Sequence, residues 1–158
     1  EAAAKAANGS SSSTTHLALT DPDSNFVVPA YAQRFGGDFA LDSQGDYRQI
    51  FVGDASGKQL SVLKISQSID DFGWASGPSA TLYVTDGSAD LIYRVTGPFQ
   101  KGMEVVAVTP CDAGNAPAAC PAPGFPNNYM GVLNQTTGAV TKFALSTPIN
   151  PAGLLFTP

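Results

Sequence analysis

Three segments of this 158-residue chain share one pattern: an apolar stretch that ends in Asp or Asn, a short polar turn, and a second stretch in which apolar and polar residues alternate. The first stretches end at Asp54, Asp86 and Asn134, which are 32 and 48 residues apart. A period of two with turns rich in Gly, Asp, Ser and Asn indicates β-hairpins. Because the same residue type recurs at the same place, we expect these three side chains to cap the turns.

The three hairpins are expected over residues 49–65, 81–96 and 128–145. Each follows a segment that is a candidate for its partner strand: 38–45, 70–75 and, before a long loop, 103–108. A unit of three to four antiparallel strands that repeats in this way is typical of a β-propeller blade. We therefore predict an all-β fold built from propeller blades of antiparallel strands.

Composition supports this fold class and excludes several partners. Only 13% of the residues are charged, about half the usual ~25%, while Gly and Pro number 16 and 12. Few Glu, Lys and Arg residues and many turn formers argue against a helical protein. A net charge of −5 without a basic stripe excludes nucleic acid as the main partner. The longest apolar runs, such as residues 105–108, are far shorter than the ~20 residues of a membrane span.

A family resemblance rests on the first repeat, in which Ile50-Phe51-Val52-Gly53-Asp54 leads into Leu60-Ser61-Val62-Leu63. This pattern resembles the blades of NHL-type and SMP-30/gluconolactonase-type six-bladed β-propellers. The resemblance covers about residues 17–158, and residues 150–156 resemble the start of a further blade or a ring-closing strand. The chain is also similar to uncharacterised secreted proteins of actinobacteria.

For the lactonases, the resemblance implies a divalent metal in the central channel, held by Glu, Asn and Asp side chains, with an Asp as acid or base. Glu104 is the only Glu after the first residue, and no motif assigns it to that role. The catalytic residues are therefore unknown, and we favour a non-enzymatic role while leaving a metal-dependent hydrolase or lactonase as an alternative.

The number of repeats is too small for a complete ring, since propellers close with about four to eight blades. About three blades would leave two apolar flanks open. Three alternatives remain: the chain belongs to a longer propeller, a second copy or another chain supplies the remaining blades, or the repeats form a sandwich instead.

The first fifteen residues differ from the rest. Residues 1–5 read EAAAK, the unit of a semi-rigid helical spacer, and residues 8–15 read as a flexible linker. We interpret 1–15 as a spacer, either artificially introduced or natural, and 16–158 as a partial β-propeller domain of about three blades. His16, the only histidine, stands at the junction, which argues against a Ser-His-Asp triad or a His-based metal site.

Cys111 and Cys120 are the only cysteines and flank a loop rich in Pro, Gly and Ala. Their spacing is not C-x-x-C, and nothing nearby supplies further zinc ligands. We predict a disulfide, which implies an oxidising compartment and therefore secretion.

Two groups of polar residues are candidate sites. Asp21, Asp23 and Asn25 alternate as in the first half of a calcium loop, although the later EF-hand positions do not match. Calcium is the only cofactor we consider, and Asx-turns that cap the backbone are the structural alternative. Asp70, Asp71 and Trp74 form the densest chemical cluster, in which the indole would line a ligand-binding channel or pack between blades.

Together these patterns predict a secreted β-propeller-type binding or structural module of unknown ligand. The alternatives are the lactonase named above and an assembly or attachment component that a partner chain completes. The expected partners are the remaining blades or a second chain.

Overall fold

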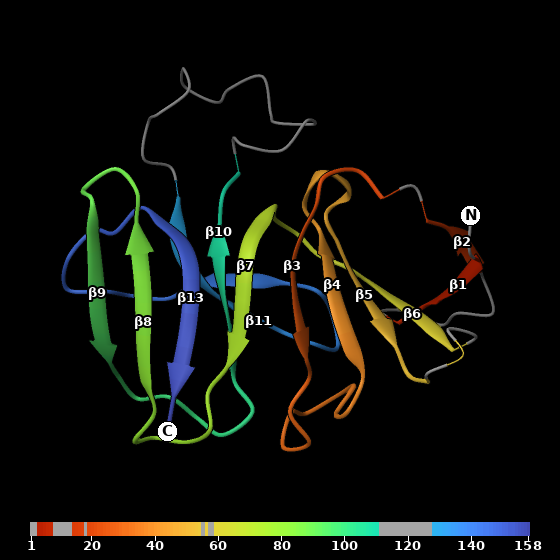
Figure 1. Ribbon diagram of the computed structural model, residues 1–158, viewed down its shortest axis with the longest axis horizontal. Coiled ribbons are helices and arrows are strands. Elements are labelled where there is room, and N and C mark those ends of the chain that lie inside the picture. Colours follow the sequence, from red (N-terminus) through yellow and green to blue (C-terminus); the bar gives the residue numbers. More distant parts are fainter. Residues whose placement is uncertain (1–2, 8–13, 18, 55, 57–58, 111–127) are drawn as a thin grey trace.

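The structure is a computed structural model that describes residues 3–7, 14–17, 19–54, 56, 59–110 and 128–158. These residues form three β-sheets, and the only helical element among them is a short 3₁₀ turn, η1 (Gln44–Asp46) (Figure 1). The predicted all-β class is confirmed. Within this described part, no helix has the length and hydrophobicity that crossing a membrane requires.

The largest sheet, sheet A, contains the first six strands in the order β2-β1-β6-β5-β4-β3. All its neighbours are antiparallel except β1 and β6. Its strands are β1 (Ala3–Ala6), β2 (Thr14–His16), β3 (Pro22–Val27), β4 (Phe39–Ser43), β5 (Arg48–Val52) and β6 (Leu60–Lys64).

The other two sheets are antiparallel throughout. Sheet B has the order β12-β11-β10-β7 and sheet C has the order β13-β8-β9. Sheet B contains β7 (Ile69–Trp74), β10 (Glu104–Val108), β11 (Tyr129–Leu133) and β12 (Val140–Lys142). Sheet C contains β8 (Thr81–Asp86), β9 (Leu91–Thr96) and β13 (Pro151–Thr157).

All three expected hairpins form, as β5–β6, β8–β9 and β11–β12. Their expected partner strands are correct for the first and third hairpins, since β4 pairs with β5 and β10 with β11. The second expectation is wrong: β7 pairs with β10, and β13 takes the place beside β8. Leu154 and Phe156 of β13 pack into the same core cluster as Leu82 and Val84, so tertiary packing decides this pairing.

The N-terminal segment differs from the helical spacer that its sequence suggests. Residues 3–6 form β1, which lies parallel to β6 and between β6 and the edge strand β2 of sheet A. Ala4 is buried in a small cluster with Ile50 and Val62. A five-residue helix is not stable alone in water, whereas an unpaired strand edge offers backbone partners.

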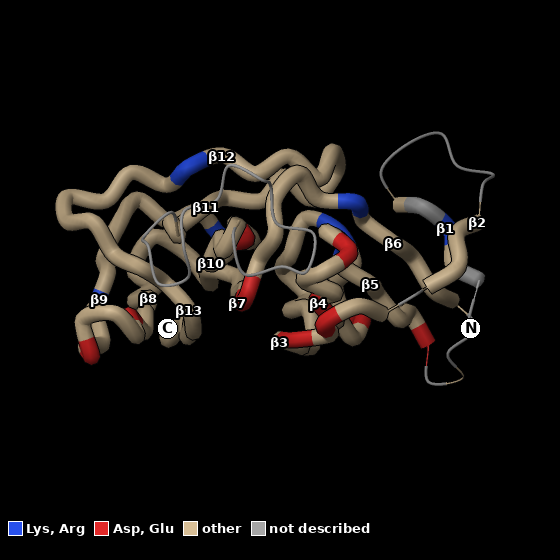
Figure 2. The backbone as a smooth tube through the Cα atoms, turned by 90° about the horizontal axis from the view of Figure 1, so that it is seen from above, with Lys and Arg blue, Asp and Glu red and all other residues tan. Residues whose placement is uncertain are grey.

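The three sheets spread like a fan from β3, β7 and β13, which lie next to one another (Figure 2). We call these three strands the inner edge. One core cluster fills the wedge between sheets A and B and includes Phe51, Leu63, Phe72 and Val106. A second cluster lies between sheets B and C and includes Leu82, Val84, Val105 and Met130. The sheets therefore form neither a closed barrel nor a two-layer sandwich.

Candidate functional site

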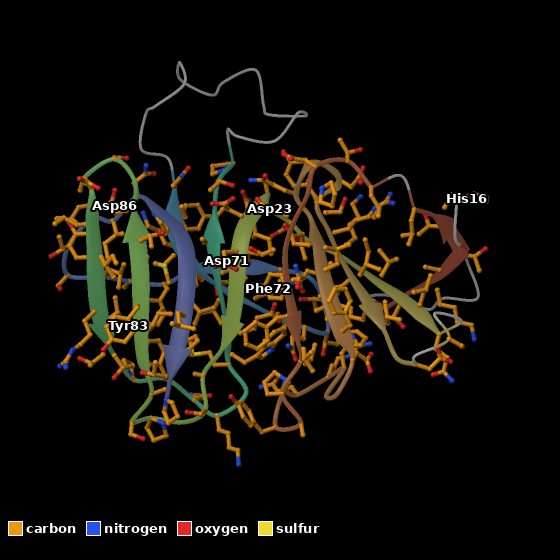
Figure 3. All side chains as sticks on the ribbon, viewed as in Figure 1. His16, Asp23, Asp71, Phe72, Tyr83 and Asp86 are labelled. Atoms are coloured by element: carbon orange, nitrogen blue, oxygen red, sulfur yellow. The ribbon has the colours of Figure 1, made fainter. Side chains whose placement is uncertain are left out.

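Acidic residues gather on the side of the molecule where β3, β7 and β13 meet (Figure 2). This inner edge brings together both groups of candidate residues, because Asp21, Asp23 and Asn25 lie at or in β3 while Asp70, Asp71 and Trp74 lie in β7. Figure 3 shows Asp23 and Asp71 close to each other, where β3 and β7 run side by side.

Asp71 connects all three sheets. Its Oδ2 accepts a hydrogen bond from the backbone N–H of Leu154 in β13, at 2.6 Å. Its carboxylate also accepts a hydrogen bond from the Ser24 side chain of β3, and its Oδ1 accepts one from the backbone N–H of Phe72, at 2.8 Å. Burial raises the pKa of Asp71 above its ordinary value, with a smaller contribution from Asp23, while these hydrogen bonds act in the opposite direction. The carboxylate of Asp71 therefore holds the three sheets together through these hydrogen bonds.

Asp42 of β4 is the most perturbed group, and sequence reasoning missed it. Its side chain is fully buried, and neither carboxylate oxygen has a hydrogen-bond partner among the described residues. Burial raises its pKa from 3.8 to about 9, and the charges of Asp23, Glu104, Asp70 and Asp71 act in the same direction. Asp42 is thus a neutral acid at pH 7. Alternation gives no signal for this burial. A period of two puts Asp42 on the same face of β4 as Ala40 and the larger Phe39 and Leu41 on the other, and only the structure shows that the Ala40 face is the buried one.

The second buried carboxyl group is Glu104 of β10, in the wedge between sheets A and B. Its Oε1 accepts a hydrogen bond from Nε2 of Gln49, at 2.6 Å, and its Oε2 accepts one from Nε2 of Gln135, at 2.7 Å. Burial raises the pKa of Glu104 to about 7, against the effect of the two amides.

Gln49 donates to Glu104 and is the neighbour of Asp42 across the sheet. It lies directly opposite Asp42 across β4 and β5, so both side chains project from the same face of the sheet. Its Oε1 has no partner among the described residues. A protonated Asp42 carries a hydroxyl donor, and this amide oxygen is the acceptor that lacks one.

Trp74 is a core residue. Its ring is buried, packs edge-on against Phe72 at a centroid distance of 5.5 Å, and lies 5.7 Å from the ring of Phe26. The indole packs between sheets A and B, and its expected part in ligand binding stays an untested prediction. Asp70 lies beside Asp71 and is half-buried.

Two of the three calcium candidates occupy extended backbone rather than a loop. Asp23 and Asn25 are exposed residues of the strand β3, and Asp21 precedes it with a φ of 55°. The backbone carbonyl of Asp21 accepts a hydrogen bond from the N–H of Gln44, at 3.0 Å. Calcium binding by these three residues remains an untested prediction.

The metal that the lactonase resemblance implies does not fit these residues. Glu104 is enclosed, and both its oxygens are engaged by amides, so it is not presented to an ion. In the described ranges, no group of three or more His, Cys, Asp or Glu side chains is placed to hold a metal ion. We therefore derive no catalytic step through a metal.

The capping function expected of the repeated Asp and Asn residues is confirmed for Asp86 and Asn134, whose side chains accept backbone N–H groups of their turns. Oδ1 of Asp86 accepts the N–H groups of Ser88 and Ala89, each at 3.0 Å. Oδ1 of Asn134 accepts those of Thr136 and Thr137, at 2.9 and 3.0 Å. Oδ1 of Asp54 accepts the hydroxyl of Ser56, at 2.9 Å.

The remaining candidates lie elsewhere. His16 is exposed in β2, at the end of the molecule farthest from sheet C (Figure 3). Cys111 and Cys120 are outside the described residues, so their disulfide stays a prediction.

Comparison of the chain with family models, with curated proteins and with solved structures gave no match.

Proposed function

We propose that the chain is a secreted β-propeller-type binding or structural module, and that its three sheets form one sector of a larger ring. The observation that carries this proposal is that the outer faces of the two end sheets, which do not pack against sheet B, hold exposed apolar side chains among polar ones. On sheet A, Ile50 and Val62 of that face are buried in the small cluster with Ala4.

The exposed face of sheet A, which we call flank A, carries a row of apolar residues. Val27, Phe39, Val52 and Leu60 are direct neighbours across β3, β4, β5 and β6, so their side chains project from one face. Val27 is 63% exposed and Phe39 is 42% exposed. The opposite face carries Ala40, Phe51 and Leu63, which are buried against sheet B.

Sheet C repeats this arrangement on its outer face, which we call flank C. Leu155, Tyr83 and Arg94 are direct neighbours across β13, β8 and β9, and Ile92 pairs with Thr85 in a neighbouring row. Leu155 is 57% exposed and Ile92 is 69% exposed. Tyr83 lies in β8 (Figure 3) and is 38% exposed.

Uncovered apolar area of this kind favours association, since removing it from water stabilises by about 25 cal/mol per Å². Further sheets packed against flank A and flank C would extend the radial arrangement of sheets around the inner edge. The same flanks support the alternative of an assembly component that another chain completes.

The test is the mass of the native particle isolated from its source, measured by native mass spectrometry. We expect a mass well above the 16.3 kDa of this chain, from further blades, a second copy or a partner chain. Val27→Lys and Ile92→Lys are expected to reduce that association. Leu19→Lys is the matched control, because Leu19 is 48% exposed but lies outside both flanks.

A 16.3 kDa particle that stays soluble and binds no hydrophobic dye would contradict the proposal. An association that Val27→Lys and Ile92→Lys both leave unchanged would also contradict it, since the flanks would then not be the interface.

A further inference from the structure

A pocket of about 420 Å³ lies between sheets B and C, apart from flanks A and C and from the inner edge. Residues of β11 and β12 and of the segment that leads to β13 line it from one side, and the end of β8 lines it from the other. Its volume is in the range of pockets that hold small molecules, about 300–1,000 Å³. The function proposed above does not use it.

The floor of the pocket is apolar. Met130 and Ile149 are buried members of the core cluster between sheets B and C, and Phe143 and Leu145 pack against that cluster. The Phe143 ring is stacked on Phe99, with 5.7 Å between the ring centroids. A floor tied to the core in this way is pre-formed and favours an apolar ring or chain.

One side of the pocket carries a cation. Nζ of Lys142 in β12 lies 5.5 Å from the ring centroid of Tyr129 in β11, and both residues line the pocket. The ring face helps to hold the ammonium group in place. Burial raises the pKa of the Tyr129 hydroxyl above its ordinary value. An anionic ligand group would find its charge partner here.

On the other side, the side-chain oxygen of Asn150 is an enclosed hydrogen-bond acceptor that receives no donor from the described residues. The backbone N–H of Asn150 donates to Oδ2 of Asp86, at 2.9 Å, and its Nδ2 donates to the hydroxyl of Ser88. Its Oδ1, by contrast, is enclosed and has no partner among the described residues. Buried acceptors are nearly always paired. Because this oxygen is closed to solvent as it stands, a donor on a bound molecule reaches it only when the Asn150 side chain turns toward the pocket that it lines.

Asp86 sets the orientation of such a molecule. Its carboxylate already accepts three backbone N–H groups, from Ser88, Ala89 and Asn150. Its negative charge disfavours an anion at the Asn150 side of the pocket and favours one at the Lys142 side.

We propose that this pocket binds a small amphipathic carboxylate that carries a hydroxyl group at its opposite end. The apolar body lies on Met130, Phe143 and Ile149, the carboxylate pairs with Lys142, and the hydroxyl donates to Oδ1 of Asn150.

The test is an NMR titration of the ¹⁵N-labelled protein with 3-(4-hydroxyphenyl)propionate as the probe. We expect saturable shifts of the amides of Met130, Ile149 and Asn150. The neutral amide of the probe is expected to bind about fivefold more weakly, as is typical of an exposed ion pair. The analogue without the hydroxyl is expected to bind about two- to tenfold more weakly, as is typical of one hydrogen bond.

Two variants separate the pocket from the rest of the surface. Lys142→Met is expected to abolish the preference for the acid over its amide. Lys101→Met is the matched control, because Lys101 makes a similar contact with the Tyr31 ring, at 5.7 Å, but does not line the pocket. Leu145→Trp, which fills the pocket, is expected to prevent binding of all three probes.

Three results would overturn the proposal. Shifts confined to Tyr83, Ile92 and Leu155 would place the probe on flank C. Equal effects of Lys142→Met and Lys101→Met would remove the charge pair, and equal binding with and without the hydroxyl would remove the Asn150 contact. None of these results bears on the mass of the native particle, so this proposal and the proposed function fail separately.

Discussion

Asp42 and Glu104 place two carboxyl groups inside the wedge between sheets A and B, where both have pKa values above their ordinary ones. When a carboxyl group has a higher pKa in the folded state than in the unfolded state, the folded protein becomes less stable as the pH rises from the lower value to the higher one. For Asp42 this window runs from 3.8 to about 9, and for Glu104 from 4.5 to about 7. We expect the protein to have a higher melting temperature at pH 5 than at pH 8.

Asp42→Asn tests this argument. The amide cannot ionise, and its Nδ2 can donate to Oε1 of Gln49, which lacks a partner. At pH 8 we expect the free energy of unfolding to increase by about 1–3 kcal/mol, which is the usual range for relieving a poorly satisfied buried group. At pH 4, where the unfolded state also holds the proton for much of the time, the difference is expected to shrink. Thermal denaturation at the two pH values measures both.

The matched control is Asp90→Asn at an exposed turn position with a φ of 54°, where Asn is well tolerated. It is expected to leave the pH dependence unchanged. A change of stability in Asp42→Asn that is the same at pH 4 and pH 8 would show that folding does not raise the pKa of Asp42.

At the scale of single elements, β11 contains the described glycine whose added Cβ would meet its neighbours at the shortest distance, Gly131. A Cβ built at Gly131 would lie 2.6 Å from Cγ1 of Val140, and 3.0 and 3.1 Å from methyl groups of Val106 and Val108. Glycine at this position therefore lets β10, β11 and β12 pack together. Glycine is required at position 131 because side chains of neighbouring strands lie close to its backbone, and not because of its backbone dihedral angles.

Gly131→Ala is expected to lower the free energy of unfolding by about 1–3 kcal/mol, as overpacking of a core does. Val140→Ala removes the closest methyl group, so the double variant is expected to regain part of the loss. Gly77→Ala is the control, because no atom lies within 4 Å of its added Cβ, and we expect a change within about 0.5 kcal/mol. Urea denaturation measures all three, and a Gly131→Ala variant as stable as Gly77→Ala would contradict the geometry.

At the scale of the whole molecule, the inner edge holds the fan together. Asp71 of β7 reaches β3 through Ser24 and β13 through Leu154, and no single sheet contains all three strands. Gly73, on the same face of β7, has Phe156 of β13 against it. The register of sheet C against sheet B therefore depends on a few contacts along one strand.

Asp71→Ala is expected to loosen sheet C without unfolding sheet A. Hydrogen exchange of the Leu154 amide is expected to accelerate about ten- to a hundredfold, in line with the loss of a charge-assisted hydrogen bond. Amides of β5 and β6 serve as the internal control and are expected to keep their rates. Asp71→Asn, which retains one acceptor, is expected to fall between the two. Equal acceleration in β5 and β13 would instead indicate global destabilisation.

Local chemistry determined much of this fold from the sequence alone. The all-β class and the three hairpins follow from alternation and turn residues, which act between neighbours in the chain. The capping by Asp86 and Asn134 follows for the same reason, because each side chain bonds to N–H groups two and three residues ahead. The packing of Trp74 was one of two weighed alternatives, and only the structure selects it.

Only the tertiary structure decided the rest. The pairing of β7 with β10 and of β13 with β8 joins strands 30 or more residues apart, and the entry of residues 3–6 into sheet A depends on the free edge of β6. Asp42, Glu104 and the pocket at Lys142 and Asn150 exist because separate sheets meet there. Burial and electrostatic coupling depend on which sheets face each other, and alternation along one strand carries no information about that.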